Sequence, residues 1–88
     1  MTGARQHPAA VLVVDDNDAN RFAKTARLRR AGFAVFEAGT GRDALDALSQ
    51  HPVDVVLLDI NLPDMSGLDV LARMSSTSEA SRRTTLDD

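Results

Sequence analysis

The sequence predicts an α/β fold with an open parallel sheet, and three observations lead to this prediction. Short apolar segments alternate with segments of helical periodicity up to about residue 74. The first and third apolar segments are nearly continuous, which is typical of strands buried on both faces. These same two segments end directly in aspartates, at Asp15 and at Asp59. Strands and helices in alternation favour parallel strands joined by right-handed crossovers.

The first strand is predicted at residues 10–14 (AVLVV), a continuous run rich in valine. It stops at four polar residues, of which we expect Asp18 to cap the N-terminus of the next helix. Helical periodicity follows over residues 19–31, and Gly32 is placed to end this helix as a C-terminal cap. Phe22 falls on the same face as three alanines of the helix, so we expect it in the core.

The same alternation of strand and helix continues along the chain. The expected elements are a strand at 33–38, a helix at 42–50, a strand at 53–58 and the start of a helix at 68–74. In the second helix Ala44, Leu45 and Leu48 recur at helical spacing, which predicts its buried face. Because the first and third strands are the most apolar, we place them side by side in the centre of the sheet.

A length of 88 residues indicates one small domain. We predict a polar lead-in at residues 1–9, the domain itself at residues 10–74, and a polar tail or linker at residues 75–88. This last segment (SSTSEASRRTTLDD) has one large apolar residue, Leu86, which is too little apolar surface to build a packed element.

Composition and charge exclude several classes of protein. The absence of cysteine excludes disulfides and zinc–thiolate sites. A net charge of −3 and an aromatic content of 3% argue against binding to nucleic acid, and the arginines of the first helix fit a solvated face. No apolar run approaches the ~20 residues that span a bilayer, so no membrane association and a cytoplasmic location are expected.

Three aspartates are expected to converge at one edge of the sheet. In open α/β sheets, sites form at the carboxyl ends of the strands, where the strand order reverses. If the first and third strands are neighbours, Asp15, Asp16 and Asp59 meet there. Three negative charges at such short separation repel one another, and a bound cation relieves this repulsion. Carboxylates without histidine or cysteine suit Mg²⁺, beside which an aspartate can accept a phosphoryl group as an acyl phosphate.

Acids that follow strands also serve as helix caps or solvated charges, and this interpretation stays open for individual residues. Asp64 and Asp69 fit solvated charges of a loop or a helix start equally well. The segment Asp16-Asn17-Asp18 also mimics the acid-x-acid signature of Mg²⁺-dependent phosphatases with an aspartate nucleophile. That class of hydrolase expects a further lysine downstream of the nucleophile strand, and the only lysine here is Lys24 in the first predicted helix.

Three stretches of the sequence resemble the receiver domain of two-component response regulators. VLVVDDNDANR (11–21) resembles the first strand of that family with its acidic pair, and LRRAGFAVFEAGTGRDALDAL (28–48) resembles the stretch from the first helix to the second. VDVVLLDINLPDMSGLDVL (53–71) resembles the phosphoacceptor strand with its loop. The resemblance implies a flavodoxin-like sheet with strand order 2-1-3, in which the fourth and fifth strands of the family are missing.

The resemblance implies a role for individual residues. Asp59 would be the phosphoacceptor. Asp16 would bind Mg²⁺ directly, Asp15 would bind it through water, and Asn61 would offer its backbone carbonyl. The phosphoryl group would come from a phosphohistidine on a histidine kinase or a histidine phosphotransfer domain. The chain would then be a signalling phosphoacceptor and not an enzyme with an external substrate.

Part of the family pattern is not recognisable in the sequence. The fourth strand with its hydroxyl residue and the fifth strand with its lysine are not evident; the only lysine is Lys24, and Thr84 and Thr85 lie in the polar tail. The alternative is therefore a degenerate receiver that acts only as a protein–protein interaction or dimerisation module. An uncovered third strand also predicts a homo-oligomer that forms through this strand or the third helix.

Overall fold

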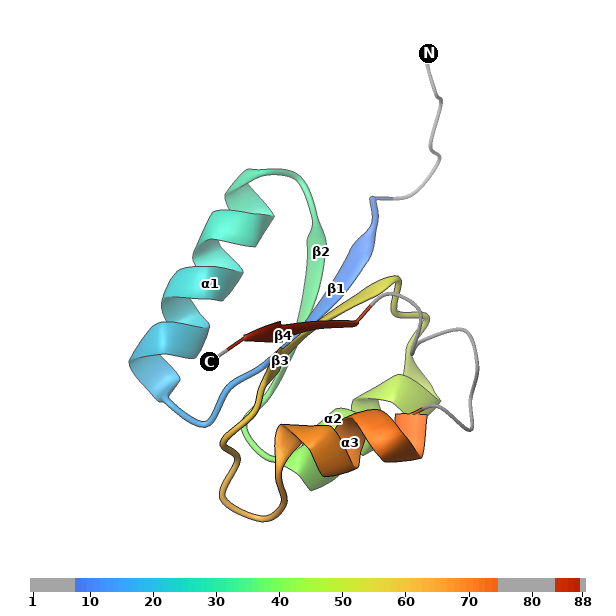
Figure 1. Cartoon of the computed structure of the whole chain (residues 1–88). Coiled ribbons are helices and arrows are strands. Elements are labelled where there is room, and N and C mark those ends of the chain that lie inside the picture. The colour runs from blue at the N-terminus through green and yellow to red at the C-terminus, as the bar shows by residue number, and fades with distance from the viewer. Residues whose placement is uncertain (1–7, 75–83, 88) are drawn as a thin grey trace.

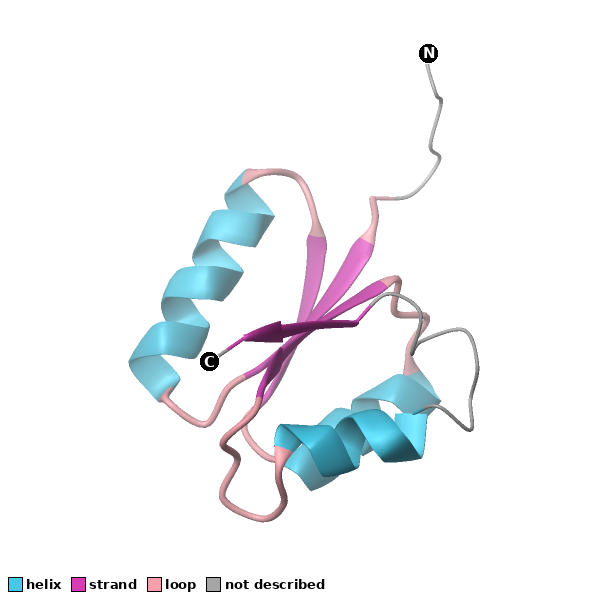
Figure 2. Ribbon diagram, viewed as in Figure 1, coloured by secondary structure: helices cyan, strands magenta, loops and turns pink. Residues whose placement is uncertain are grey.

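The computed structural model describes residues 8–74 and 84–87, which form one parallel sheet with helices on both faces (Figure 1). The elements are β1 (Ala10–Val14), α1 (Asp18–Arg30), β2 (Ala34–Ala38), α2 (Gly41–Gln50), β3 (Val55–Asp59), α3 (Gly67–Met74) and β4 (Thr84–Asp87). Helix α1 covers one face of the sheet, and α2 and α3 lie together on the other (Figure 2). This is the open α/β architecture that the alternating pattern predicts.

The strand order is β2-β1-β3-β4, with every pair parallel. The predicted order 2-1-3 is confirmed, and β1 lies between β2 and β3 as its apolar sequence requires. The prediction that the fourth strand is missing was wrong, because residues 84–87 pair with β3. These residues were expected in a polar tail; residues 75–83 and 88 of that segment lie outside the described part of the chain.

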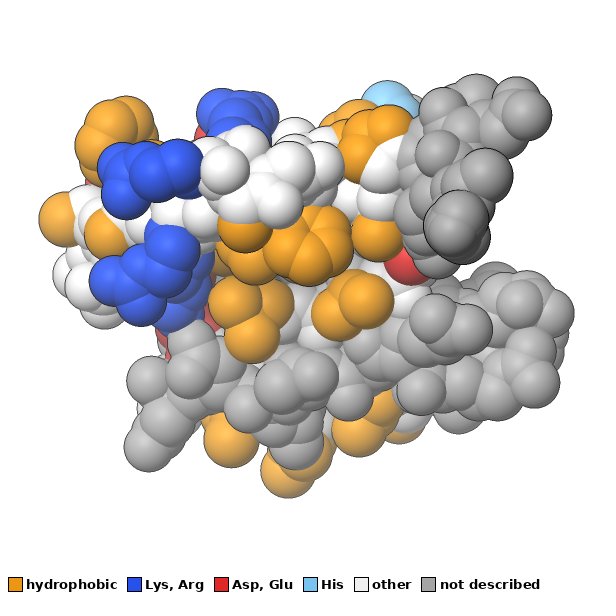
Figure 3. All heavy atoms as spheres, turned by 90° about the horizontal axis from the view of Figure 1, so that it is seen from above, with side chains coloured by type: hydrophobic (Ala, Val, Ile, Leu, Met, Phe, Trp, Pro, Cys, Tyr) orange, Lys and Arg blue, Asp and Glu red, His pale blue; other side chains and the backbone are white. Residues whose placement is uncertain are grey.

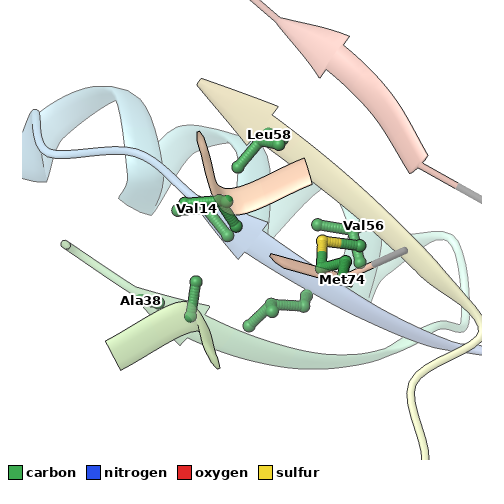
Figure 4. Close-up of a cluster of buried hydrophobic side chains, with 8 residues drawn as sticks. Val14, Ala38, Val56, Leu58 and Met74 are labelled. Carbon is green, nitrogen blue, oxygen red and sulfur yellow. The ribbon is translucent and has the colours of Figure 1, made fainter. Parts of the chain in front are cut away.

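The main core lies between the sheet and the pair α2 and α3 (Figure 4). Leu12 and Val14 of β1 alternate with Val11 and Val13, so the two pairs point to opposite faces of the sheet. All four side chains are buried, which is why β1 reads as a continuous apolar run. The core cluster consists of Leu12, Val14, Ala38, Ala44, Val56, Leu58, Val70 and Met74.

Helix α1 begins and ends with recognisable caps. Its N-cap is Asn17, whose side chain accepts a hydrogen bond from the backbone N–H of Asn20 at 2.8 Å. The prediction that Asp18 is the cap was therefore wrong by one residue: Asp18 is the first helical residue and pairs with Arg21. At the other end Gly32 has a φ of 99°, the left-handed conformation that favours glycine, and it closes the helix as predicted.

Phe22 does not belong to the core, and the sequence-based prediction was wrong on this point. Its side chain is 73% exposed. Successive helical residues are turned by about 100°. Thr25 is buried and Leu28 is partly buried, so the sheet-facing stripe of α1 runs through Thr25 and Leu28 and leaves Phe22 to one side of it. The arginines near the C-terminal end of α1 are exposed, and basic side chains gather there on the surface (Figure 3).

Among the described residues, no helix combines the length and the apolar character needed to cross a membrane.

Candidate functional site

The three aspartates singled out from the sequence lie together at the carboxyl edge of the sheet. Strands β1 and β3 are neighbours with Val14 opposite Leu58, so the residues that follow them reach the same point. One carboxylate oxygen from each of Asp15, Asp16 and Asp59 lies within 4.8 Å of the others. We call these three residues the acidic cluster. Asp15 and Asp59 are buried, whereas Asp16 is exposed to solvent.

Asp15 is held in place through both of its carboxylate oxygens. Oδ1 accepts a hydrogen bond from the backbone N–H of Asn17 at 3.0 Å, and Oδ2 accepts one from Nζ of Lys24 at 2.8 Å. Burial by itself raises the pKa of this carboxyl. The Lys24 ammonium and the Asn17 N–H outweigh that effect, so the pKa of Asp15 lies below its ordinary value. Asp15 is therefore a fixed negative charge.

Asp59 experiences the opposite electrostatic environment. Its Oδ1 accepts a hydrogen bond from the backbone N–H of Asn61 at 3.0 Å, which favours the charged form. Burial, and next to it the negative charges of Asp15 and Asp16, raise the pKa of Asp59 above its ordinary value. The structure thus places a partly desolvated carboxylate beside two others, an arrangement that a cation stabilises.

The loop that follows β3 passes next to the acidic cluster. Asn61 forms an isolated bridge with Ser66, and the N–H of Gly67 donates to the carbonyl of Ile60 at 2.6 Å. A Cβ at Gly67 would collide with the backbone carbonyl of Asp59, so only glycine allows this close approach. The loop and Asp16 line an open hollow with a volume of about 390 Å³.

Asp64 ties this loop to the start of α2. Its carboxylate oxygens accept hydrogen bonds from the backbone N–H groups of Gly41 at 2.8 Å and Arg42 at 2.9 Å. These N–H groups lack partners within the helix, and a carboxylate there also faces the positive end of the helix dipole. Asp64 therefore acts as a helix cap supplied from a distant loop, and not only as a solvated charge.

Two basic residues at the site were not identified from the sequence. Lys24 reaches Asp15 from α1, although no sequence pattern assigned a role to this lysine. Arg21 donates from one guanidinium nitrogen to the backbone carbonyl of Asp15 at 2.7 Å and from the others to Asp18 and Glu37. A sequence signal existed, because both residues lie within the first two turns of the helix that starts at the site.

The donor set of the acidic cluster fits a hard divalent cation. The side-chain donors are carboxylate oxygens, which Mg²⁺ prefers over nitrogen or sulfur ligands. The raised pKa of Asp59 reflects its burial and the same close negative charges, which a cation would neutralise. The backbone N–H of Asn61 donates to Asp59, which places Asn61 beside the acidic cluster.

The sequence is similar to bacterial regulators. It is 51% identical to the transcriptional regulatory protein KdpE of Mycobacterium tuberculosis over 61 residues, which are 69% of this chain and 27% of that protein. It is 35% identical to the sporulation initiation phosphotransferase F of Bacillus subtilis over 69 residues, 78% of this chain and 56% of that protein. The chain therefore spans between about a quarter and just over half the length of these curated relatives.

Solved structures of receiver domains share the fold. The chemotaxis response regulator CheY4 of Vibrio cholerae has a TM-score of 0.85 and 30% identity, with coverage of 90% of this chain and 67% of that one. The response regulator TrrA of Thermotoga maritima, in complex with Mg²⁺ and BeF, has a TM-score of 0.78 and 28% identity, with coverage of 89% and 65%.

The model of the response regulator receiver domain family matches residues 11–85, a range that includes both aspartate-bearing strands and the start of β4. Sequence, fold and family match agree on one assignment. The chain belongs to the response regulator receiver domains of two-component signalling systems.

Proposed function

We propose that the chain accepts a phosphoryl group on Asp59, in a reaction that depends on Mg²⁺. The observation that carries this proposal is the convergence of Asp15, Asp16 and Asp59 within 4.8 Å at the carboxyl edge of two neighbouring strands. Family membership supports it, since the response regulator family carries the phosphoacceptor on the strand that β3 resembles. The chain itself is then a signalling acceptor that turns over no external substrate.

Asp59 is the nucleophile in this proposal. Its Oδ1 is held by the Asn61 N–H, which leaves Oδ2 to attack the phosphorus atom. A P–O bond forms to Asp59 while the P–N bond to the donor imidazole breaks, and the imidazole nitrogen keeps the electron pair and takes up a proton. Partial burial of Asp59 limits access of water to the acyl phosphate that results.

The acidic cluster and the backbone carbonyl of Asn61 would hold the Mg²⁺ ion. Such an ion would neutralise charge on the phosphoryl oxygens during transfer. Asp15 contributes a fixed negative charge, because its pKa is held low. Exposed Asp16 lines the hollow beside the loop, where an ion can enter from solvent. The Thermotoga maritima response regulator with bound Mg²⁺ and BeF supports this ligand class for the fold.

The phosphodonor is a phosphohistidine on a histidine kinase or a histidine phosphotransfer domain. Two-component membership supports this partner class. The open hollow beside Asp16 gives a partner side chain a route to the acidic cluster.

Intact-mass measurement after incubation with phosphoramidate and Mg²⁺ tests the proposal. We expect the mass of one phosphoryl group to be added to the protein, and hydroxylamine to remove it, since acyl phosphates react with that nucleophile. Chelation of Mg²⁺ should slow the labelling by at least about tenfold. Continuous release of phosphate from small phosphoesters would instead support the phosphatase interpretation.

Two matched variants locate the modification. Asp59→Asn should abolish the mass increase, whereas Asp69→Asn, which removes an exposed aspartate of α3, should leave it unchanged. Labelling that persists in Asp59→Asn would rule out Asp59 as the phosphoacceptor.

The alternative predicted from the sequence is a degenerate receiver that acts only through protein–protein interaction. The backbone register of β3 and β4 pairs Asp87 with Asp59. The absence of any label on a folded protein would support this alternative.

Self-association stays a prediction in modified form. The edge of β3 is covered by β4, so the expected association through that strand loses its basis. The third helix keeps an exposed apolar side chain, Leu68, which is 55% accessible to solvent. Sedimentation at micromolar concentration distinguishes a monomer from a dimer formed through α3.

A further inference from the structure

Lys24 brings a positive charge into direct contact with the acidic cluster. Its Nζ lies 2.8 Å from Oδ2 of Asp15, and the two side chains are 27% and 5% exposed, respectively. The pair is therefore largely shielded from solvent on the aspartate side and partly open on the lysine side. This geometry differs from that of an ordinary surface ion pair, in which both groups are well hydrated.

The position of Lys24 is fixed by the helix that carries it. Helix α1 starts three residues after Asp15, and Asn17 caps it. Arg21, one turn before Lys24, donates to the backbone carbonyl of Asp15, so the end of β1 and the first turns of α1 are joined through two side chains. The ammonium is thus directed at the carboxylate by a rigid element and not by a flexible loop.

We propose that Lys24 acts as an internal counter-ion of the acidic cluster and lowers the affinity of the cluster for divalent cations. The proposal rests on the Mg²⁺ site proposed above. A divalent ion near Asp15 either displaces the ammonium from Oδ2 or is repelled by it at short range. In either case, the Lys24 ammonium, which already neutralises Asp15, makes the free energy of Mg²⁺ binding less favourable.

The same contact has a second consequence for the protein without metal. Three carboxylates within 4.8 Å destabilise the folded state, and Lys24 offsets part of this repulsion. Removal of the ammonium should therefore weaken the metal-free fold and strengthen the response of the fold to Mg²⁺. These two opposite effects would not arise from a lysine that only packs against the surface.

Isothermal titration calorimetry with MgCl₂ compares the wild-type chain with Lys24→Met and Lys24→Arg. We expect Lys24→Met to bind Mg²⁺ about tenfold more tightly, the size expected for one charge acting on a divalent ion a few ångströms away in a solvated site. Lys24→Arg keeps the charge and should stay within about threefold of the wild type. Arg30→Met removes an exposed charge from the far end of α1 and should not change the affinity.

Thermal unfolding in EDTA and in excess MgCl₂ gives the second readout. Lys24→Met should melt below the wild type in EDTA and gain more than the wild type from Mg²⁺. If Lys24→Met is too unstable to titrate, Lys24→Gln, which retains a hydrogen-bond donor, takes its place.

The outcomes separate this proposal from the proposed function. Equal Mg²⁺ affinities in the wild type and Lys24→Met, or weaker binding in the variant, overturn the role of Lys24 while the metal site stands. Binding that is detectable only in Lys24→Met supports the counter-ion role. No binding in either protein overturns both the counter-ion role and the Mg²⁺ site.

Discussion

Asp59 combines burial with close negative neighbours, a combination that costs stability in the protein without metal. It is 7% exposed, and both burial and the charges of Asp15 and Asp16 raise its pKa. A raised pKa means that the folded state binds a proton more tightly than the unfolded chain. The ionised carboxylate present at neutral pH therefore opposes folding. This destabilisation is typical of functional sites, where groups are arranged for chemistry.

Asp59→Asn should raise the unfolding temperature of the metal-free protein at neutral pH. The variant removes the buried negative charge and keeps an oxygen that can accept the hydrogen bond from the Asn61 N–H. Differential scanning calorimetry in EDTA measures the effect, with Asp69→Asn as the matched control. A lower melting temperature for Asp59→Asn would show that repulsion within the acidic cluster is not the dominant effect at this position.

Helix α2 and the loop after β3 depend on each other. The loop residue Asp64 supplies the acceptor for two backbone N–H groups at the start of α2, while Thr40 provides the local cap through the N–H of Asp43. The loop also packs closely against the start of α2 through Met65, because a Cβ at Gly41 would collide with the Met65 side chain. The conformation of the loop beside the acidic cluster is thus coupled to the N-terminus of α2.

Asp64→Asn should lower the stability of the protein at neutral pH, with a loss that disappears in acid. The Gly41 and Arg42 N–H groups hold the pKa of Asp64 below its ordinary value of 3.8. The stabilisation is therefore fully present above pH 3.8 and is lost as the pH falls through the lower folded-state pKa.

Urea unfolding of the wild type and Asp64→Asn between pH 7 and pH 3 measures this difference. The gap in unfolding free energy should be constant near neutrality and should narrow in the acidic part of the range. A gap that does not change with pH would mean that the charge of Asp64 contributes nothing to the cap.

At the scale of the whole molecule, β4 covers the edge of the sheet next to β3. Strand β3 has the apolar sequence of a strand inside a sheet. Without β4, one edge of β3 would present unpaired backbone groups to solvent. The four residues Thr84–Asp87 pair with it in parallel register, so within the described residues the sheet has four strands, with β2 and β4 at its two edges. A short polar edge strand of this kind also resists further pairing.

Deletion of residues 84–88 should destabilise the protein and promote association. The uncovered edge of β3 is then free to pair with a second copy of the chain. Sedimentation velocity over a series of micromolar concentrations should show a mass that increases more steeply with concentration for the deletion variant than for the whole chain. A monomeric, stable deletion variant would mean that β4 contributes little to covering β3.

Elements that carry their own local signal were predictable from the sequence. The apolar run of β1, the helical spacing in α2 and the glycine at position 32 each express their structure within a few residues. The acidic cluster was also predictable, because two apolar strands that end in aspartate have few possible arrangements in a parallel sheet. The family motif around Asp59 led to the same conclusion.

Features that depend on contacts between distant residues became visible only in the folded chain. Residues 84–87 contain a single large apolar residue and form a strand by pairing with the backbone of β3, which the local sequence pattern did not reveal. The exposure of Phe22 follows from the rotation of α1 against the sheet, and the hydrogen bond from Lys24 to Asp15 follows from the position of α1 beside the end of β1. In each case a contact between residues distant in the sequence decides the structure, and the local sequence pattern does not record that contact.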